Sequence, residues 1–140
     1  MLVLDTDHLS HFDEATAAGT RLRERLLAST EEPSATIVSA EEQLRGWLAQ
    51  LHRIHADPHA AVPVYARLQR RLDFYANWTV LSWDTAAADL FRKLHSQGVR
   101  IGSMDLRIAC ITIVRGGTLL TRNSKDFSKV PGLRFDNWLD

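Results

Sequence analysis

The sequence predicts an α/β protein, a three-layer α/β/α sandwich with a central, mostly parallel sheet. The chain opens on a short continuous apolar run, Leu2–Leu4, of the kind found in strands that are buried on both faces. Short strand-like segments then alternate with amphipathic helical segments along the whole chain, and this alternation is typical of parallel strands covered by helices on both faces. The length of 140 residues suits one domain, so residues 1–140 are expected to share one core.

Composition narrows the class of protein. Hydrophobic residues make up 45% of the chain, which argues against disorder. Lys and Arg together number 17, as do Asp and Glu, so the net charge is zero and argues against binding of nucleic acid by bulk charge. The single cysteine, Cys110, excludes an internal disulfide and a cysteine-based zinc site. Because neither a signal peptide nor an apolar run of transmembrane length is present, we expect a soluble cytoplasmic protein.

Five short segments are predicted as strands because they are rich in β-branched or aliphatic residues and are bounded by turn-forming residues. They cover residues 2–4, 35–38, 79–81, 118–121 and, at an edge of the sheet, 133–135. Helices with apolar residues at i, i+3 and i+4 spacing are predicted between them. These helices cover residues 8–12, 15–30, 40–54, 64–76, 85–97 and 104–115. Short polar side chains that can accept from free amides are the expected caps of four helices, namely Asp7, Ser39, Asp84 and Ser103.

Residues 40–76 are expected to form a helical hairpin with more large apolar side chains than one small sheet face requires. Trp47 lies on its first helix, and Trp78 follows its second. This surplus can serve as core packing or as a groove for a partner helix, and the sequence leaves both open.

Four carboxylates occupy matching places in this order of elements. Asp5 follows the first strand, Glu42 opens the helix after the second, Asp105 opens a strongly apolar helix, and Asp126 lies in the polar loop after the fourth strand. In a parallel sheet these places all lie at the carboxyl ends of the strands. Taken singly, each acid is more often structural, for example as a favourable charge at a helix start.

The chemistry that such a cluster supports is the binding of a hard cation, Mg²⁺ or alternatively Mn²⁺. One or two such ions could activate water and stabilise charge on a phosphoryl oxygen. Without a cation, repulsion among four acids would lower the stability of the fold. A bound metal ion would therefore account for the presence of the cluster. The chain has no HExxH spacing, no glycine-rich phosphate loop and no GxSxG motif to compete with it.

Four stretches that contain these acids match the motifs of a known family, in the same order along the chain. They read LDTD (residues 4–7), VSAEEQLRG (38–46), IGSMDLRIA (101–109) and LTRNSKDF (120–127) with VPGL (130–133). Together they resemble the PIN domain, and specifically the VapC-type toxin ribonucleases of toxin–antitoxin pairs. The resemblance covers nearly the whole chain and implies a PIN-like fold. It also implies a Mg²⁺-dependent endoribonuclease that cuts RNA in the cytoplasm, forms homodimers and is silenced by an antitoxin. We expect the antitoxin groove beside the 40–76 hairpin.

The resemblance also implies roles for individual residues. The acidic, catalytic and metal-binding site would consist of Asp5, Glu42, Asp105 and Asp126, with Asp5 and Asp105 as the chief metal ligands. Glu42 is preferred to Glu41 because the acid of the family stands four residues before the glycine, here Gly46. Thr6 and Asn123 would support the site by hydrogen bonding. The family often has Asn at the position of Asp7, so this fifth acid leaves its own role and the number of metal ions open.

Two other functions fit parts of the sequence. Asp5 and Asp7 match the Asp-x-Asp of haloacid-dehalogenase-like phosphatases, in which the first acid is the nucleophile, but Lys125 and Asp126 poorly match the later motifs of such enzymes. A PIN-like module that binds RNA or a partner without cutting is the non-enzymatic alternative. The intact set of four acids favours the nuclease over both.

Overall fold

A computed structural model describes residues 1–140, and its five strands form one sheet in which every pair of neighbours is parallel. The strand order is β3-β2-β1-β4-β5. The strands are β1 (Leu2–Leu4), β2 (Pro33–Thr36), β3 (Val80–Leu81), β4 (Thr118–Leu120) and β5 (Arg134–Asp136). The central position of β1 explains why its three residues are all buried. The expected α/β class with a parallel sheet is confirmed.

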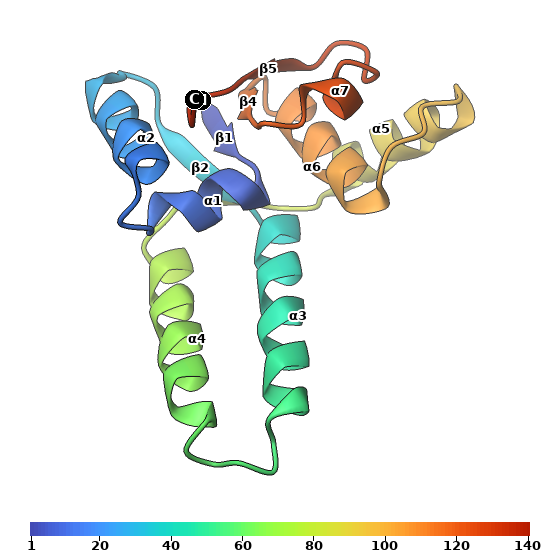
Figure 1. Cartoon of the computed structure of the whole chain (residues 1–140). Helices are drawn as coiled ribbons and strands as arrows, with labels where there is room; N and C mark the ends of the chain where they lie inside the picture. Colours follow the sequence, from blue (N-terminus) through green and yellow to red (C-terminus); the bar gives the residue numbers. More distant parts are fainter.

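Seven helices connect and cover these strands (Figure 1). They are α1 (Thr6–Phe12), α2 (Ala17–Ala28), α3 (Ile37–Arg53), α4 (Ala61–Ala76), α5 (Thr85–Ser96), α6 (Ser103–Val114) and α7 (Ser124–Phe127). No helix is both long enough and apolar enough to cross a membrane.

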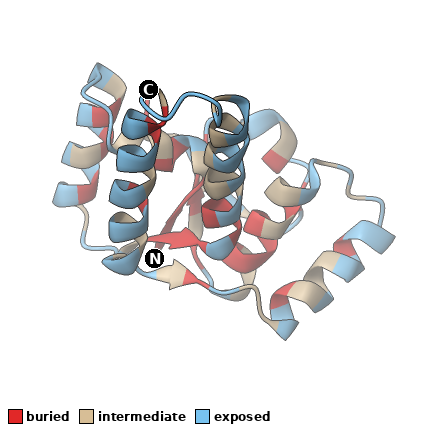
Figure 2. Ribbon diagram, turned by 90° about the horizontal axis from the view of Figure 1, so that it is seen from below, coloured by how far each residue is buried: buried red, intermediate tan, exposed pale blue.

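The core lies on both faces of the sheet, because successive side chains of a strand point to opposite faces. Leu2 and Leu4 pack with the buried leucines of α1 and α2, whereas Val3 packs with the apolar side chains of α5 and α6. Leu119 and Leu120 of β4 divide in the same way. Figure 2 shows buried residues on the strands and on the inward sides of the helices. This is the expected three-layer arrangement.

Several helices begin earlier than the sequence predicts. The side chain of Asp5, not that of Asp7, caps α1, and the side chain of Thr36, not that of Ser39, caps α3. In both cases the capping residue has extended backbone at the end of a strand, and its oxygen accepts from the amide three residues later. The helices therefore follow the strands directly. Ile37 belongs to α3 and not to the second strand, despite its β-branched side chain.

Two further expectations about helix ends were wrong, and one is confirmed. Gly102 is the N-terminal cap of α6 without a side-chain hydrogen bond, so Ser103 is the first helical residue and not the cap. The loop predicted over residues 122–127 contains the short helix α7, which is capped by Asn123. Asp84 caps α5 as expected, accepting from the amide of Ala87 at 2.9 Å.

The hairpin of α3 and α4 extends away from the sheet (Figure 1). Only the first residues of α3 are buried, and the apolar stripe further along it is partly exposed. Most of the large exposed hydrophobic side chains of the chain lie on these two helices: Ile37, Leu48, Val62, Tyr65 and Leu72. The hairpin therefore leaves part of its apolar surface exposed within this chain. Of the two roles left open by the sequence, a surface for a partner agrees better with this exposure.

Candidate functional site

The site begins where β1 ends. Asp5 is only 7% exposed, and its backbone N–H donates to the carbonyl of Leu120 on β4. Its carboxylate atom Oδ1 accepts from the backbone N–H of His8 at 2.8 Å and lies 3.1 Å from the His8 ring atom Nδ1. Sheet pairing and helix capping together fix this acid at the carboxyl edge of the central strand.

Glu42 reaches the same edge from α3. It lies in the second turn of that helix and not in the first, because α3 begins at Ile37. The hydroxyl of Thr6 donates to Glu42 Oε1 at 2.7 Å and lies 3.1 Å from the hydroxyl of Ser39. These contacts join the start of α1 to α3 and orient the Glu42 carboxylate.

The pKa of Asp105 is affected by the charges of the other three acids. Burial raises the pKa of Asp105, and the negative charges of Glu42, Asp5 and Asp126 raise it further, to about 6. A hydrogen bond from Asn123 acts in the opposite direction. The other three acids named from the sequence thus lie near enough for their charges to act on Asp105.

Asp126 closes this group from α7. The side-chain amide of Asn123 donates to Asp126 Oδ2 at 3.0 Å, and Lys129 Nζ lies 3.7 Å from Oδ1. The hydrogen bond from Asn123 is the main cause that lowers the pKa of Asp126, and Lys129 adds to it. Asn123 thus orients the Asp126 carboxylate through a direct hydrogen bond.

The charges of these acids act on one another, but the side chains are not assembled as a finished coordination shell. No three Asp, Glu, His or Cys side chains of the chain are close enough together to hold a metal ion by themselves. The donor set still suits Mg²⁺, since it consists of carboxylate oxygens and since this ion keeps several of its waters and needs few protein ligands. Burial is the main cause of the raised pKa of Asp105, and the negative charges of Glu42, Asp5 and Asp126 add to it; a bound cation would offset both effects.

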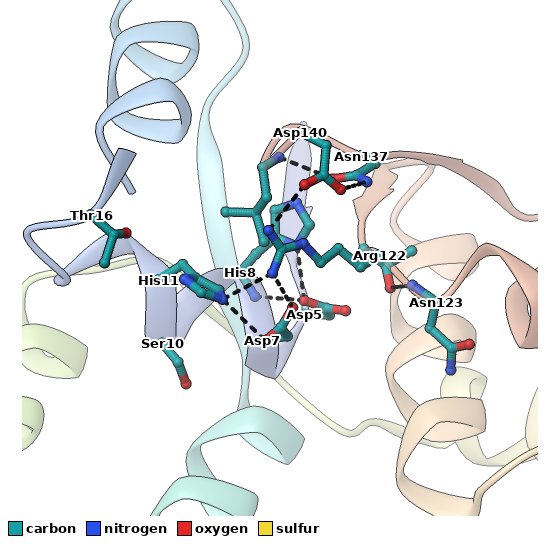
Figure 3. Close-up of polar contacts among 12 residues, drawn as sticks. Asp5, Asp7, His8, Ser10, His11, Thr16, Arg122, Asn123, Asn137 and Asp140 are labelled. Atoms are coloured by element: carbon teal, nitrogen blue, oxygen red, sulfur yellow. Dashed lines mark hydrogen bonds and ion pairs between the residues drawn. The ribbon is translucent and has the colours of Figure 1, made fainter. Parts of the chain in front are cut away.

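Asp7 is exposed on α1, where it lies near His11 and Arg122 (Figure 3). Its carboxylate is 3.6 Å from His11 Nε2 and 4.0 Å from Arg122 Nη1. Arg122 in turn contacts Asp140 at 3.1 Å. The fifth acid therefore faces His11 and Arg122 at the surface.

Sequence reasoning missed His8, which is completely buried against Asp5. The available signal was its place three residues after an acid at a strand end. At that spacing the first turn of a helix brings the two side chains together.

No protein-family model matches the chain, but two curated proteins that resemble part of it are both VapC nucleases. Ribonuclease VapC2 of Rickettsia felis is 40% identical over 50 residues, which are 36% of this chain and 37% of that protein. The tRNA(fMet)-specific endonuclease VapC of Salmonella typhimurium is 32% identical over 69 residues, or 46% of this chain and 52% of that protein. The chain therefore matches about half or less of the length of these curated relatives.

Similarity to solved structures extends over nearly the whole chain. A chain of VapBC-1 from nontypeable Haemophilus influenzae has a TM-score of 0.76 at 20% identity, covering 99% of this chain and 98% of that one. A chain of a toxin–antitoxin complex from Klebsiella pneumoniae has a TM-score of 0.66 at 17% identity, with 95% of each chain covered. The chain thus has the PIN-like α/β fold of VapC chains, and its resemblance to VapC ribonucleases is confirmed in sequence over part of its length.

Proposed function

We propose that this chain, taken as one PIN-like domain, is a metal-dependent endoribonuclease of the VapC type, a phosphodiester hydrolase that cuts RNA. The observation that carries the proposal is that Asp5, Glu42 and Asp126 all act on the pKa of Asp105 at the carboxyl edge of a parallel sheet. Named ribonucleases among the relatives support the same reaction class. Because the substrate would be RNA, we place the activity in the cytoplasm.

In this proposal Asp5 and Asp105 hold Mg²⁺ or Mn²⁺, and Glu42 and Asp126 complete the site directly or through water. When bound, the cation would activate a water molecule and stabilise charge on a phosphoryl oxygen. Asp5 brings a carboxylate that the start of α1 holds rigidly. Thr6 keeps Glu42 aimed at the site, and Asn123 does the same for Asp126.

An antitoxin is the proposed protein partner, and the α3–α4 hairpin is its proposed docking region. Large apolar side chains on this hairpin face solvent, among them Leu48, Tyr65 and Leu72. Such a surface suits the apolar face of a partner helix. A homodimer is a further expectation from the family resemblance.

Purification with the product of the neighbouring gene, followed by an RNA cleavage assay on the freed protein, tests the proposal. Cleavage should require Mg²⁺ or Mn²⁺, should stop when EDTA is added, and should be lost in Asp5→Asn. Metal-dependent cleavage that survives Asp5→Asn contradicts the role given to Asp5. Formation of a covalent aspartyl-phosphate would instead favour the phosphatase, and RNA binding without cleavage would favour the non-catalytic module.

A further inference from the structure

His8 is a fully buried polar side chain whose two ring nitrogens both have partners. Its Nε2 atom accepts a hydrogen bond from the backbone N–H of Trp138 at 3.3 Å. A backbone N–H can only donate, so Nε2 carries no hydrogen and the ring hydrogen must be on Nδ1. The Nδ1–H group therefore donates to Asp5 Oδ1, at 3.1 Å.

This arrangement makes the two oxygens of the Asp5 carboxylate unequal. Oδ1 accepts from both the backbone N–H and the ring of His8. Oδ2 makes no hydrogen bond within the chain, and Asp5 keeps 7% of its surface exposed. One oxygen is thus held on the protein side, and the other is left for a ligand at the site.

The donor that fixes the His8 ring is itself firmly placed. Leu139, the residue after Trp138, is fully buried, and its carbonyl accepts from Arg21 Nε and Nη2 at 3.0 and 2.8 Å. Further contacts join the same segment to the rest of the chain, from Arg25 to the carbonyl of Asn137 and from Arg122 to Asp140 (Figure 3). Residues 137–140, the last segment of the chain, therefore set the orientation of His8, although β1 and this segment lie at opposite ends of the sequence.

We propose that His8 is a positioning residue for Asp5, and that the backbone N–H of Trp138 fixes which of its ring nitrogens donates to Asp5. The inference rests on the proposed function in one respect, namely that Asp5 binds the cation. Groups that hydrogen-bond a metal ligand without touching the metal set its orientation, and their loss commonly weakens metal binding or activity. His8 has the geometry of such a group, because it restrains one oxygen of Asp5 and leaves the other unbonded.

The first test uses the unaltered protein without metal or RNA. Nitrogen-15 NMR of the histidine side chains should show His8 as a neutral ring with its hydrogen on Nδ1. A His8 ring with its hydrogen on Nε2 contradicts the proposed hydrogen bond to Asp5, whatever the activity of the protein.

The second test compares two substitutions by Mn²⁺ binding, measured by electron paramagnetic resonance in the absence of RNA. His8→Phe keeps a ring but removes both contacts, and it should weaken Mn²⁺ binding about 10-fold. His8→Asn can restore a donor near the position of Nδ1 but cannot reach Trp138, and it should stay within about threefold of the unaltered protein. Thermal unfolding of both variants provides the control, since both lose the contact to the 137–140 segment.

A merely structural role predicts a different pattern, in which the two variants lose Mn²⁺ affinity equally and in step with their stability. That result, or unchanged binding in His8→Phe, overturns the inference. If the unaltered protein binds no Mn²⁺, the proposed metal site fails together with this inference. Mn²⁺ binding by the unaltered protein therefore tests the proposed metal site. The difference in Mn²⁺ affinity between the two variants tests the positioning role of His8.

Discussion

The hydroxyl of Thr6 donates a 2.7 Å hydrogen bond to the carboxylate of Glu42, across 36 positions of sequence. It links the first turn of α1 to the second turn of α3, so that two of the four acids belong to one bonded unit. Thr6, directly after the strand-end acid Asp5, thus orients the carboxylate of Glu42 on another helix.

Replacing Thr6 with Val removes this hydrogen bond while keeping the shape of the side chain. Because Glu42 then loses its donor, RNA cleavage should fall about 10-fold, which corresponds to a loss of about 1.4 kcal/mol in transition-state stabilisation. Thr6→Ser keeps the hydroxyl and is the matched control. The measurement is kcat/KM on an RNA substrate, with thermal unfolding to check the fold. Equal activity in the two variants contradicts the role given to Thr6.

Much of the fold follows from local patterns. The buried run Leu2–Leu4, the alternation of strands and helices, and the cap at Asp84 were all predicted correctly. The predictions that were wrong lie mainly at the junctions between strands and helices. Ile37 and Val38 have β-branched side chains, yet Thr36 caps the helix that contains them, and that hydrogen bond outweighs their weak preference for strands.

The site shows a similar division between local and long-range information. The order of acids along the chain was enough to name Asp5, Glu42, Asp105 and Asp126 as candidates, and their mutual effect on Asp105 agrees with that grouping. The partner of His8 could not be predicted, because Trp138 lies 130 positions away and contributes only its backbone N–H. A backbone donor has no signature in residue identity.

Asp105 should make the metal-free protein less stable as the pH rises. Its pKa is about 6 in the folded state against an ordinary value of 3.8, so the folded state binds more protons between these values. The stabilising contribution is complete below about pH 4 and is lost as the pH rises through about 6. The shift alone corresponds to about 3 kcal/mol, and we expect about 2 kcal/mol because Asp105 is only partly buried. Asp105→Asn should abolish this loss, so the variant should be the more stable protein at pH 7 and yet inactive on RNA.

Urea unfolding of both proteins at pH 5 and at pH 7, in the presence of EDTA, measures this difference. Comparison with Asp105→Asn isolates the part of the pH dependence that requires the Asp105 carboxyl group. Added Mg²⁺ should restore the stability of the unaltered protein at pH 7 more than at pH 5. An Asp105→Asn variant that is less stable than the unaltered protein at pH 7 contradicts the electrostatic origin of the shift.

Substitutions of exposed apolar side chains on the hairpin should separate antitoxin binding from RNA cleavage. Leu48 and Leu72 are 61% and 51% exposed, so Leu48→Glu and Leu72→Glu should leave the fold and RNA cleavage intact. Each should weaken antitoxin binding at least about 10-fold, because a charge would be buried against an apolar partner. Gln69→Glu adds the same charge at an exposed polar position of α4 and should have little effect. Antitoxin affinity that is unchanged in both leucine variants excludes this face as the docking region.

Arg71 and Asp13 connect the base of the hairpin to the end of α1. The Arg71 guanidinium is almost fully buried, lies 4.8 Å from the centroid of the Phe74 ring and pairs with Asp13 at 2.8 Å. Its Nη1 atom has no hydrogen-bond partner, so Asp13 supplies most of the compensation for a buried positive charge.

Removing the acid should therefore cost more than removing the base. Asp13→Asn leaves the Arg71 charge buried without its counter-ion and should lower the free energy of unfolding by about 2 kcal/mol, a value reduced from that of a fully buried pair because half of the Asp13 side chain is exposed. Arg71→Met removes the charge, keeps most of the apolar packing against Phe74, and should cost less than about 1 kcal/mol. Urea unfolding of both single variants and of the double variant gives the coupling between the two residues. The double variant should be about as stable as Arg71→Met alone, because Asp13 has no buried charge left to compensate. A larger loss in Arg71→Met than in Asp13→Asn would show that the guanidinium stabilises the hairpin through its packing and not as one half of an ion pair.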